Sequence, residues 1–223
     1  MACFYHTLAP MTTSPDEHAG AAAGLLERAD AAAIASPAQA AALYRELLAA
    51  SPGHVEGRLR LARLLERGED LEDAVKTLSI GLRWTPDQVE FLLARGALLS
   101  RLRRYREAEA DLRGVLRLQP SHAPAHFELG QLFWRKSLAP EAAAHFAKSL
   151  ECDPENGRVF YYLAEALNLM GDLAGANAVL DRALEATPRD GKVYHLRGRV
   201  LDRLGRPDEA REMYQRSREL QVL

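Results

Sequence analysis

Apolar residues recur at spacings of three and four along most of this 223-residue chain, with polar residues between them. This spacing places the apolar side chains on one face of a helix, so the chain is expected to be all-α. Prolines, glycines and capping residues interrupt the pattern and mark the helix ends. After residue 54 the pattern predicts helices at 55–67, 71–84, 89–102, 105–118, 123–136, 139–152, 157–170, 173–186, 191–204 and 207–221.

The predicted helices belong to a repeat with a period of 34 residues. Five prolines keep this step, namely Pro52, Pro86, Pro120, Pro154 and Pro188. Six alanines keep it too, namely Ala40, Ala74, Ala108, Ala142, Ala176 and Ala210. A fixed period of this length indicates a solenoid, in which each helix pair stacks on the next. Counting places from the start of each repeat gives repeats 21–54, 55–88, 89–122, 123–156, 157–190 and 191–223, in a single domain.

Residue size and turn chemistry follow the same period. Place eight holds a small residue in five repeats, namely Ala62, Gly96, Gly130, Ala164 and Gly198, which lets two helices approach closely. Proline near the end of each repeat stops the second helix, because proline cannot continue the helical ladder. The residues expected to cap the next helix are Asp87, Ser121, Asn156 and Asp190. Gly171 and Gly205 share place fifteen and suit the tight turn between the two helices of a repeat.

From residue 21 onward the repeat resembles the tetratricopeptide repeat (TPR), W-x2-L-G-x2-Y followed by A-x3-F and P. The resemblance implies a right-handed α-solenoid of about six helix-turn-helix repeats. The first repeat is degenerate, because it keeps Ala40, Tyr44 and Pro52 but has Arg28 at place eight. Residues 1–20 are expected to form a flexible N-terminal segment. Arg218 replaces the leucine of place twenty-eight, so the last helix is expected to face water.

Two places depart from the TPR pattern. Place four favours tryptophan in the family, but it holds Arg58, Leu92, His126, Phe160 and Tyr194 here. Place seven favours leucine, but it holds Arg95 and Arg197 in two repeats. Some TPR proteins bind a C-terminal carboxylate with a lysine, an asparagine and an arginine. Lys192 matches that lysine, whereas Tyr162 and Leu196 stand at the other two positions, so such a clamp is not expected.

The resemblance also implies where a partner binds. In TPR proteins the first helix of each repeat lines the concave face, with places two, five, nine and twelve pointing into it. In repeats four to six these places give the expected partner-binding residues Phe127, Gln131, Trp134, Arg158, Tyr161, Glu165, Asn168, Lys192, His195 and Arg199. Aromatic and basic residues, which are typical of binding hot spots, are rarer at these places in repeats two and three. The alternative is an ordinary solenoid surface, or one covered by the N-terminal tail of the chain.

No residues are expected to carry catalysis, a metal or a cofactor. His122 and His126 have the spacing of a metal pair, but Pro124 lies between them and no nearby carboxylate or cysteine completes a site. The chain also lacks the G-x-S-x-G, H-E-x-x-H and phosphate-loop motifs. The densest basic run is Arg101, Arg103, Arg104 and Arg106. We interpret this run as a solvated turn that meets downstream carboxylates, rather than as a phosphate contact.

Composition narrows the setting. The net charge of −2 and pI of about 6.4 provide no overall attraction for nucleic acid. No apolar run reaches the roughly 18 residues of a membrane span, and the N-terminus lacks the features of a secretory signal. The two cysteines, Cys3 and Cys152, favour a cytoplasmic protein, and the richness in alanine, leucine and arginine suggests a bacterial one. Residues 1–10 are either a genuine tail or a product of start-site choice, because the sequence from Met11 also reads as a natural start.

These features predict a non-enzymatic module that binds a peptide or helix of a partner protein in the concave groove. Two alternatives remain open. One is a scaffold that acts by homo-oligomerisation or through its convex face, and the other is an accessory subunit of an enzyme. Groove binding predicts a monomer, which we favour, whereas the scaffold predicts a size that depends on concentration.

Overall fold

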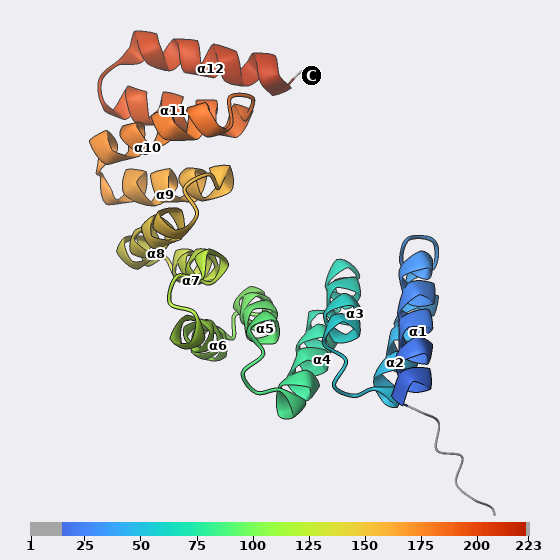
Figure 1. The fold of residues 1–223 in the computed structure, drawn as a ribbon. Coiled ribbons are helices and arrows are strands. Elements are labelled where there is room, and N and C mark those ends of the chain that lie inside the picture. Colours follow the sequence, from blue (N-terminus) through green and yellow to red (C-terminus); the bar gives the residue numbers. More distant parts are fainter. Residues whose placement is uncertain (1–14, 222–223) are drawn as a thin grey trace, which may run out of the picture. The chain divides into compact units, whose positions relative to one another are not determined.

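The computed structural model describes residues 15–221, in which the backbone forms twelve α-helices joined by short loops (Figure 1). The chain divides into two compact units, one ending at Pro86 and the other beginning at Asp87. Unit 1 contains α1 (Pro15–Ala35), α2 (Pro37–Ala50), α3 (Val55–Arg67) and α4 (Leu71–Trp84). Unit 2 contains α5 (Val89–Arg101), α6 (Tyr105–Leu118), α7 (Ala123–Arg135), α8 (Ala139–Cys152), α9 (Gly157–Met170), α10 (Leu173–Ala186), α11 (Gly191–Arg203) and α12 (Pro207–Gln221).

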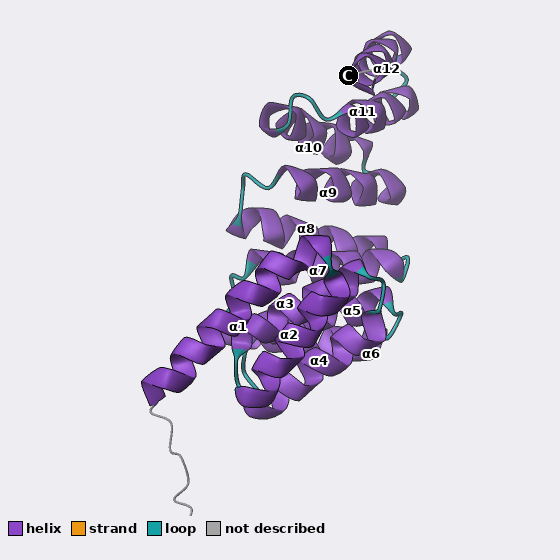
Figure 2. Ribbon diagram, turned by 90° about the vertical axis from the view of Figure 1, so that its right-hand side faces the viewer, coloured by secondary structure: helices purple, strands orange, loops and turns teal. Residues whose placement is uncertain are grey.

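The predicted all-helical solenoid of repeats is confirmed. Within each unit consecutive helices pack as pairs, and each pair packs on the next (Figure 2). The helices after residue 54 begin at the predicted residues, and only α5, α7 and α11 end earlier, by one residue each. α1 begins at Pro15, inside the segment 1–20 that was expected to be flexible. The expectations for residues 1–10 fall outside the described residues.

Place fifteen has the same backbone conformation in five repeats. Gly171 and Gly205 have positive φ angles of 84° and 73°, as their predicted role in the turn requires. Glu69, Arg103 and Ser137 also have positive φ, at 62°, 60° and 59°. A side chain in this left-handed region costs free energy that glycine avoids. The turn geometry therefore belongs to the repeat, and three repeats adopt it without glycine.

Two of the predicted helix caps are wrong by one residue. The cap of α5 is Gln88 rather than Asp87, and the cap of α7 is His122 rather than Ser121. His122 Nδ1 accepts a hydrogen bond of 3.1 Å from the backbone N–H of Ala125. His54 caps α3 in the same way, accepting from Gly57 N–H at 3.0 Å. An imidazole nitrogen thus takes the role of the expected hydroxyl or carboxylate. Asn156 and Asp190 occupy the N-cap positions of α9 and α11 as predicted, and the Asp190 side chain accepts a hydrogen bond from Lys192 N–H, whereas Asn156 makes no such bond.

The helix contacts in unit 2 require small residues. A Cβ atom added to Gly130 would lie 2.5 Å from the ring of Phe146, and one added to Gly198 would lie 2.5 Å from the ring of Tyr214. Ala142 is fully buried on the opposing helix. Because these contacts repeat every 34 residues, the period seen in the sequence is a period of helix packing.

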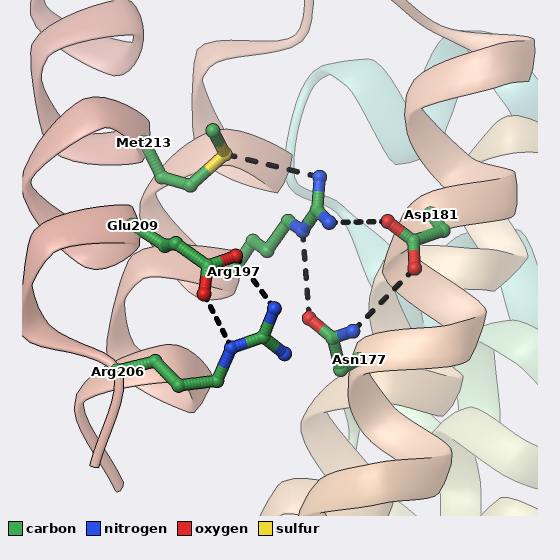
Figure 3. A network of polar contacts seen from close by, with 6 residues as sticks. All are labelled: Asn177, Asp181, Arg197, Arg206, Glu209 and Met213. Atoms are coloured by element: carbon green, nitrogen blue, oxygen red, sulfur yellow. Dashed lines mark hydrogen bonds and ion pairs between the residues drawn. The ribbon is translucent and has the colours of Figure 1, made fainter. Parts of the chain in front are cut away.

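The arginines at place seven are accommodated by polar partners. Arg95 on α5 donates two hydrogen bonds of 2.7 Å to the carboxylate of Asp111 on α6. Arg197 on α11 contacts Asp181 and Asn177 on α10, and its third nitrogen lies 3.9 Å from the sulfur of Met213 on α12 (Figure 3). Each arginine therefore joins its own helix to neighbouring ones where the family places leucine.

The first repeat in unit 1 is more regular than its sequence indicates. Ala29 is fully buried and packs in one cluster with Ala40, Tyr44 and Leu64. It supplies the small contact one residue after Arg28, which stands at place eight. The Tyr44 hydroxyl donates a 2.6 Å hydrogen bond back to Asp30 on α1. α1 is therefore held to α2 by both apolar and polar contacts.

The last helix, α12, has a strongly polar outer surface. Arg218 at place twenty-eight is exposed, whereas Leu82 and Leu150 at the same place are buried. Arg211 and Arg216 each form an ion pair of 3.1 Å with a carboxylate on the same helix. Across residues 15–221, none of the helices is both long and apolar enough to span a bilayer.

Candidate functional site

The ten predicted partner-binding residues lie on three first helices of unit 2, and we call them the A-helix row. α7 carries Phe127, Gln131 and Trp134; α9 carries Arg158, Tyr161, Glu165 and Asn168; and α11 carries Lys192, His195 and Arg199. The four cationic or imidazole side chains are exposed, and Trp134, Tyr161 and Glu165 are partly exposed. Phe127 and Gln131 are each only 8% exposed, and Asn168 is 2% exposed. The side chains of these three residues are therefore largely covered within the chain, and their contact with a partner stays a prediction.

Phe127 is the centre of an aromatic cluster. Its ring lies 5.8 Å from that of Phe146 and 5.7 Å, edge-on, from that of Tyr162. The guanidinium of Arg158 lies over the Phe127 ring at 4.9 Å and over Tyr162 at 5.9 Å. Such cation–π contacts stabilise a partly exposed arginine by about 0.5–1 kcal/mol. The contact between Phe127 and Arg158 thus stabilises the packing of α9 on α7.

A second chain of contacts joins α9 to α11. The Tyr161 hydroxyl donates to Glu165 Oε1 at 3.2 Å, and Arg199 donates to the same oxygen at 3.1 Å. Burial, together with the nearby Glu165 carboxylate, raises the pKa of Tyr161, so it remains a neutral hydrogen-bond donor. Glu165 and Arg199 are 34 residues apart, one full repeat. Their pairing neutralises two of the charges that the sequence offered to a partner.

Asn168 and His195, also in the row, form contacts with other side chains of the chain. Arg203 donates to both the backbone and the side-chain oxygen of Asn168, which explains the burial of that amide. The ring of His195 lies 5.4 Å from the ring of Tyr214 on α12. Tyr214 in turn donates to Asp202 at 2.7 Å. Burial and this bond to Asp202 raise the pKa of Tyr214 to about 12.

Four members of the row are accessible and form neither an ion pair nor a cation–π contact within residues 15–221. The side chains of Trp134 and Lys192 make no polar or ring contact within residues 15–221, Tyr161 is partly exposed, and His195 is exposed. Gln131 lies behind them, and its side-chain nitrogen is buried without a hydrogen-bond partner among the described residues. The accessible surface is therefore two aromatic faces, one lysine and one imidazole.

Sequence reasoning did not assign Tyr162 to this surface. It lies at place six, outside places two, five, nine and twelve, yet its ring stacks on Phe146 at 5.7 Å and meets Tyr161 edge-on at 5.6 Å. The run of three aromatic residues at Phe160, Tyr161 and Tyr162 was the available signal. Tyr162 supports Tyr161 from behind and thereby restricts its orientation.

Unit 1 has its own polar cavity, about 480 Å³ in volume, between α1, α2 and α3. Arg60, Arg63 and Arg67 line it together with Asp30 and Tyr44. Asp30 accepts hydrogen bonds from Tyr44 and Arg60, which outweigh the effect of burial and lower its pKa. Burial and the bond to Asp30 raise the pKa of Tyr44 to about 12. The charges at the centre of this cavity are therefore matched within the chain.

His122 and His126, which have the spacing of a metal pair, make capping and packing contacts in the structure. His122 caps α7, and His126 Nδ1 lies 3.3 Å from His145 Nδ1. His145 stacks on Phe133 with 5.4 Å between ring centroids. Within residues 15–221, no three histidine, cysteine or carboxylate side chains come together as metal ligands.

The basic turn behaves as interpreted from the sequence. Arg104 donates two hydrogen bonds of 2.8 Å to the Glu107 carboxylate, three residues downstream. Arg103 and Arg106 are exposed on either side of it.

Comparison with solved structures identifies the same architecture in other proteins. A crystal structure of MamA is 18% identical with a TM-score of 0.67, covering 73% of this chain and 95% of that chain. MamA 41-end from Desulfovibrio magneticus RS-1 is 21% identical with a TM-score of 0.67, covering 82% and 95%. YrrB, described as a TPR protein with an unusual peptide-binding site, is 16% identical with a TM-score of 0.64, covering 80% and 92%. At these identities the likeness concerns the fold alone.

Sequence comparison names the family. No curated protein matches the chain significantly. One tetratricopeptide repeat family model matches residues 93–157. A second tetratricopeptide repeat model matches residues 35–98, 139–200 and 169–221. These matches together extend from the second helix to the last, so the chain belongs to the tetratricopeptide repeat family.

Proposed function

We propose that the chain is a non-catalytic protein-interaction module that holds an extended or helical segment of a partner against the A-helix row of unit 2. The observation that carries the proposal is the series of accessible side chains on three successive first helices: Trp134 on α7, Tyr161 on α9, and Lys192 and His195 on α11. Aromatic side chains of this kind bury much area at low entropic cost. Membership of a repeat family of interaction modules supports it, as does the peptide-binding site named for YrrB.

The contacts inside the row sharpen the expected ligand. Arg158 is engaged by Phe127, and Arg199 by Glu165, so neither cation is the first choice for a partner carboxylate. Lys192 is exposed and is the cation best placed to receive one. The ligand therefore has apolar side chains for Trp134 and Tyr161 and an acidic group for Lys192. A ligand with many acidic residues is disfavoured because Glu165 lies in the same row.

The test is affinity capture of the native partner, identified by mass spectrometry, followed by binding measurements on purified variants. Trp134→Ala and Tyr161→Ala should each weaken binding about thirtyfold, which corresponds to about 2 kcal/mol. Lys192→Glu should weaken it about tenfold. Tyr105→Ala is the matched aromatic control, because Tyr105 is partly exposed at the start of α6, outside the row. Circular dichroism confirms that each variant is folded.

The alternatives give different outcomes. If the three row variants keep the partner and changes on the second helices release it, the chain binds through its outer face. If a stable enzyme co-purifies and gains activity from the chain, the accessory-subunit role replaces the present proposal. If sedimentation shows that mass rises with concentration and no partner is captured, the chain is a self-assembling scaffold. We further propose the bacterial cytoplasm as the setting, on the basis of composition and cysteine usage.

A further inference from the structure

Unit 1 has a second cavity, of about 330 Å³, on the side of its second helices. It lies between α2, α3 and α4, and its apolar walls come from Leu48, Pro52, Leu61 and Ile80. Ile80 is 40% exposed at the rim. Trp84 follows one helical turn later on α4 and is 62% exposed, so a large apolar side chain extends the rim on the same side of the helix. An exposed tryptophan beside an apolar hollow is typical of an interaction surface.

A buried arginine forms part of the lining of this cavity. Arg58 is only 4% exposed, and it donates to the backbone oxygens of Pro52 at 2.6 Å and Thr77 at 3.1 Å. Its Nε has no hydrogen-bond partner among the described residues. Burial and the nearby Arg83 cation lower the pKa of the Arg58 guanidinium. A buried cation that is satisfied only by neutral carbonyls leaves an uncompensated positive charge, which attracts an anion.

The rim adds to this charge. Arg45 lines the cavity and is exposed, and none of the described lining residues is acidic. A 2.7 Å hydrogen bond from Lys76 and, to a smaller extent, the charge of Arg45 lower the pKa of Asp73, a carboxylate outside the cavity lining. The cavity thus has apolar walls and an excess of positive charge, a combination that neither a wholly apolar nor a wholly acidic ligand would match.

We propose that this cavity docks a segment of a partner protein in which an apolar side chain is flanked by carboxylates. The apolar side chain enters between Leu48, Leu61 and Ile80, and the carboxylates meet Arg45 at the rim within the field of Arg58. Charge complementarity selects this partner over an uncharged one. The site lies in unit 1, on helices other than those of the A-helix row. This proposal can therefore be tested independently of the function proposed above.

Three labelled peptides test the proposal against the full chain by fluorescence anisotropy. The probe GSDELLDEGS has both features, GSNQLLNQGS lacks the carboxylates, and GSDEGGDEGS lacks the apolar side chains. Saturable binding of the first peptide, with each of the other two at least tenfold weaker, is the expected result. Failure of the first peptide to saturate at about 1 mM, or equal binding of all three, would overturn the proposal.

Variants locate the binding. Arg45→Glu and Ile80→Asp should each weaken the first peptide at least tenfold, and both positions are exposed enough to keep the fold. Arg106→Glu makes the same charge change on an exposed arginine of α6 and should leave binding within twofold. Equal losses for Arg45→Glu and Arg106→Glu would reduce the effect to general charge and overturn the proposal.

Two further outcomes name other occupants. If Tyr161→Ala and Lys192→Glu abolish peptide binding while Arg45→Glu does not, the peptide binds the A-helix row and the proposal is wrong. If the chain alone shows a mass that rises with concentration in sedimentation, and Ile80→Asp abolishes this rise, the cavity is filled by a second copy and the proposal is equally wrong.

Discussion

Arg95 in unit 2 and Arg58 in unit 1 both stand on a first helix where the TPR pattern favours an apolar residue, but their surroundings differ. Arg95 forms two hydrogen bonds with the carboxylate of Asp111. Arg58 is more deeply buried and meets only backbone carbonyls. The charge of Arg95 is therefore compensated by a carboxylate and stabilises the fold. The charge of Arg58 meets only neutral carbonyls and gives the adjacent cavity a positive electrostatic potential.

The same contrast separates the two candidate surfaces. In the A-helix row, Arg199 is paired with Glu165 and Arg158 lies on Phe127. Affinity there has to come mainly from aromatic faces. In the cavity between α2, α3 and α4, none of the described lining residues is acidic, so charge contributes to selectivity there together with the apolar walls. Whether a cation is already paired thus decides what kind of ligand a repeat surface can select.

The largest expected effect is the loss of the matched partner. Asp111→Ala would leave Arg95 half-buried without its carboxylate, and should lower the free energy of unfolding by about 3 kcal/mol in denaturant titrations. Replacing both residues with leucine should recover most of this loss. Asp208→Ala, which breaks an exposed ion pair on α12, is the control and should change stability by less than about 0.5 kcal/mol. Equal losses for Asp111→Ala and Asp208→Ala would contradict the description of Arg95 as matched.

The stability of the protein should depend on pH because of His145, a partly buried histidine with a lowered pKa. Burial and the nearby charges of His126, Lys148 and Arg113 lower the pKa of His145 to about 4 from 6.5. The unfolded chain therefore binds more protons between these values, and stability falls as pH drops through that window. We expect a loss of about 1–2 kcal/mol between pH 7 and 5, reduced from the full linkage value because the ring is half-buried. This loss should be largely absent in His145→Gln, and an unchanged pH profile in that variant would show that other groups cause it.

Removal of the unmatched charge should have a smaller effect on stability. Arg58→Met keeps the packing volume and removes the buried charge, but it also removes the hydrogen bonds that Arg58 donates to the carbonyls of Pro52 and Thr77. These terms oppose each other, so the free energy of unfolding should change by no more than about 1 kcal/mol. A loss as large as that of Asp111→Ala, measured in the same titration, would mean that Arg58 is primarily structural.

The smallest expected effects on stability are at Arg103, an exposed arginine in the turn between α5 and α6. Arg103 has a φ of 60° at place fifteen, so Arg103→Gly should raise stability by about 0.5 kcal/mol through relief of backbone strain. Gly171→Ala, at a φ of 84°, should lower it by about 1 kcal/mol. Arg103→Lys keeps the charge and the backbone conformation and should change nothing measurable. If Arg103→Lys behaves like Arg103→Gly, the guanidinium itself matters and the turn is more than a solvated one.

The helices were predictable because their ends are set locally. Proline, the positive-φ turn and the spacing of apolar residues act within a few positions, and the helices after residue 54 match the structure to within one residue. The state of each surface residue was less predictable. Asn168 is buried by Arg203, 35 residues later, and Phe127 is covered by Arg158. Such contacts form when long side chains extend from one repeat to the next. The position of a residue within its own repeat does not predict them.

The same limit applies to two residues at groove-facing places in repeats two and three. Leu59 is 6% exposed and Ser100 is 2% exposed, although both occupy places that the family directs toward the groove. The sequence also gave no indication that the conspicuous arginine at position 58 would lack an acidic partner, because Asp and Glu are plentiful nearby along the chain. Pairing is decided by three-dimensional reach rather than by local composition.

The polar surface of α12 has a consequence for how the chain behaves among its own copies. A stack of similar repeats resembles a linear polymer, whose growing end would accept a further unit of the same kind. The arginines on the outside of α12, Arg218 among them, are exposed and do not offer the leucine that an incoming helix would need. We therefore expect the outer surface of α12 to disfavour end-to-end stacking of copies, so that the mass contributed through this surface does not rise with concentration in sedimentation.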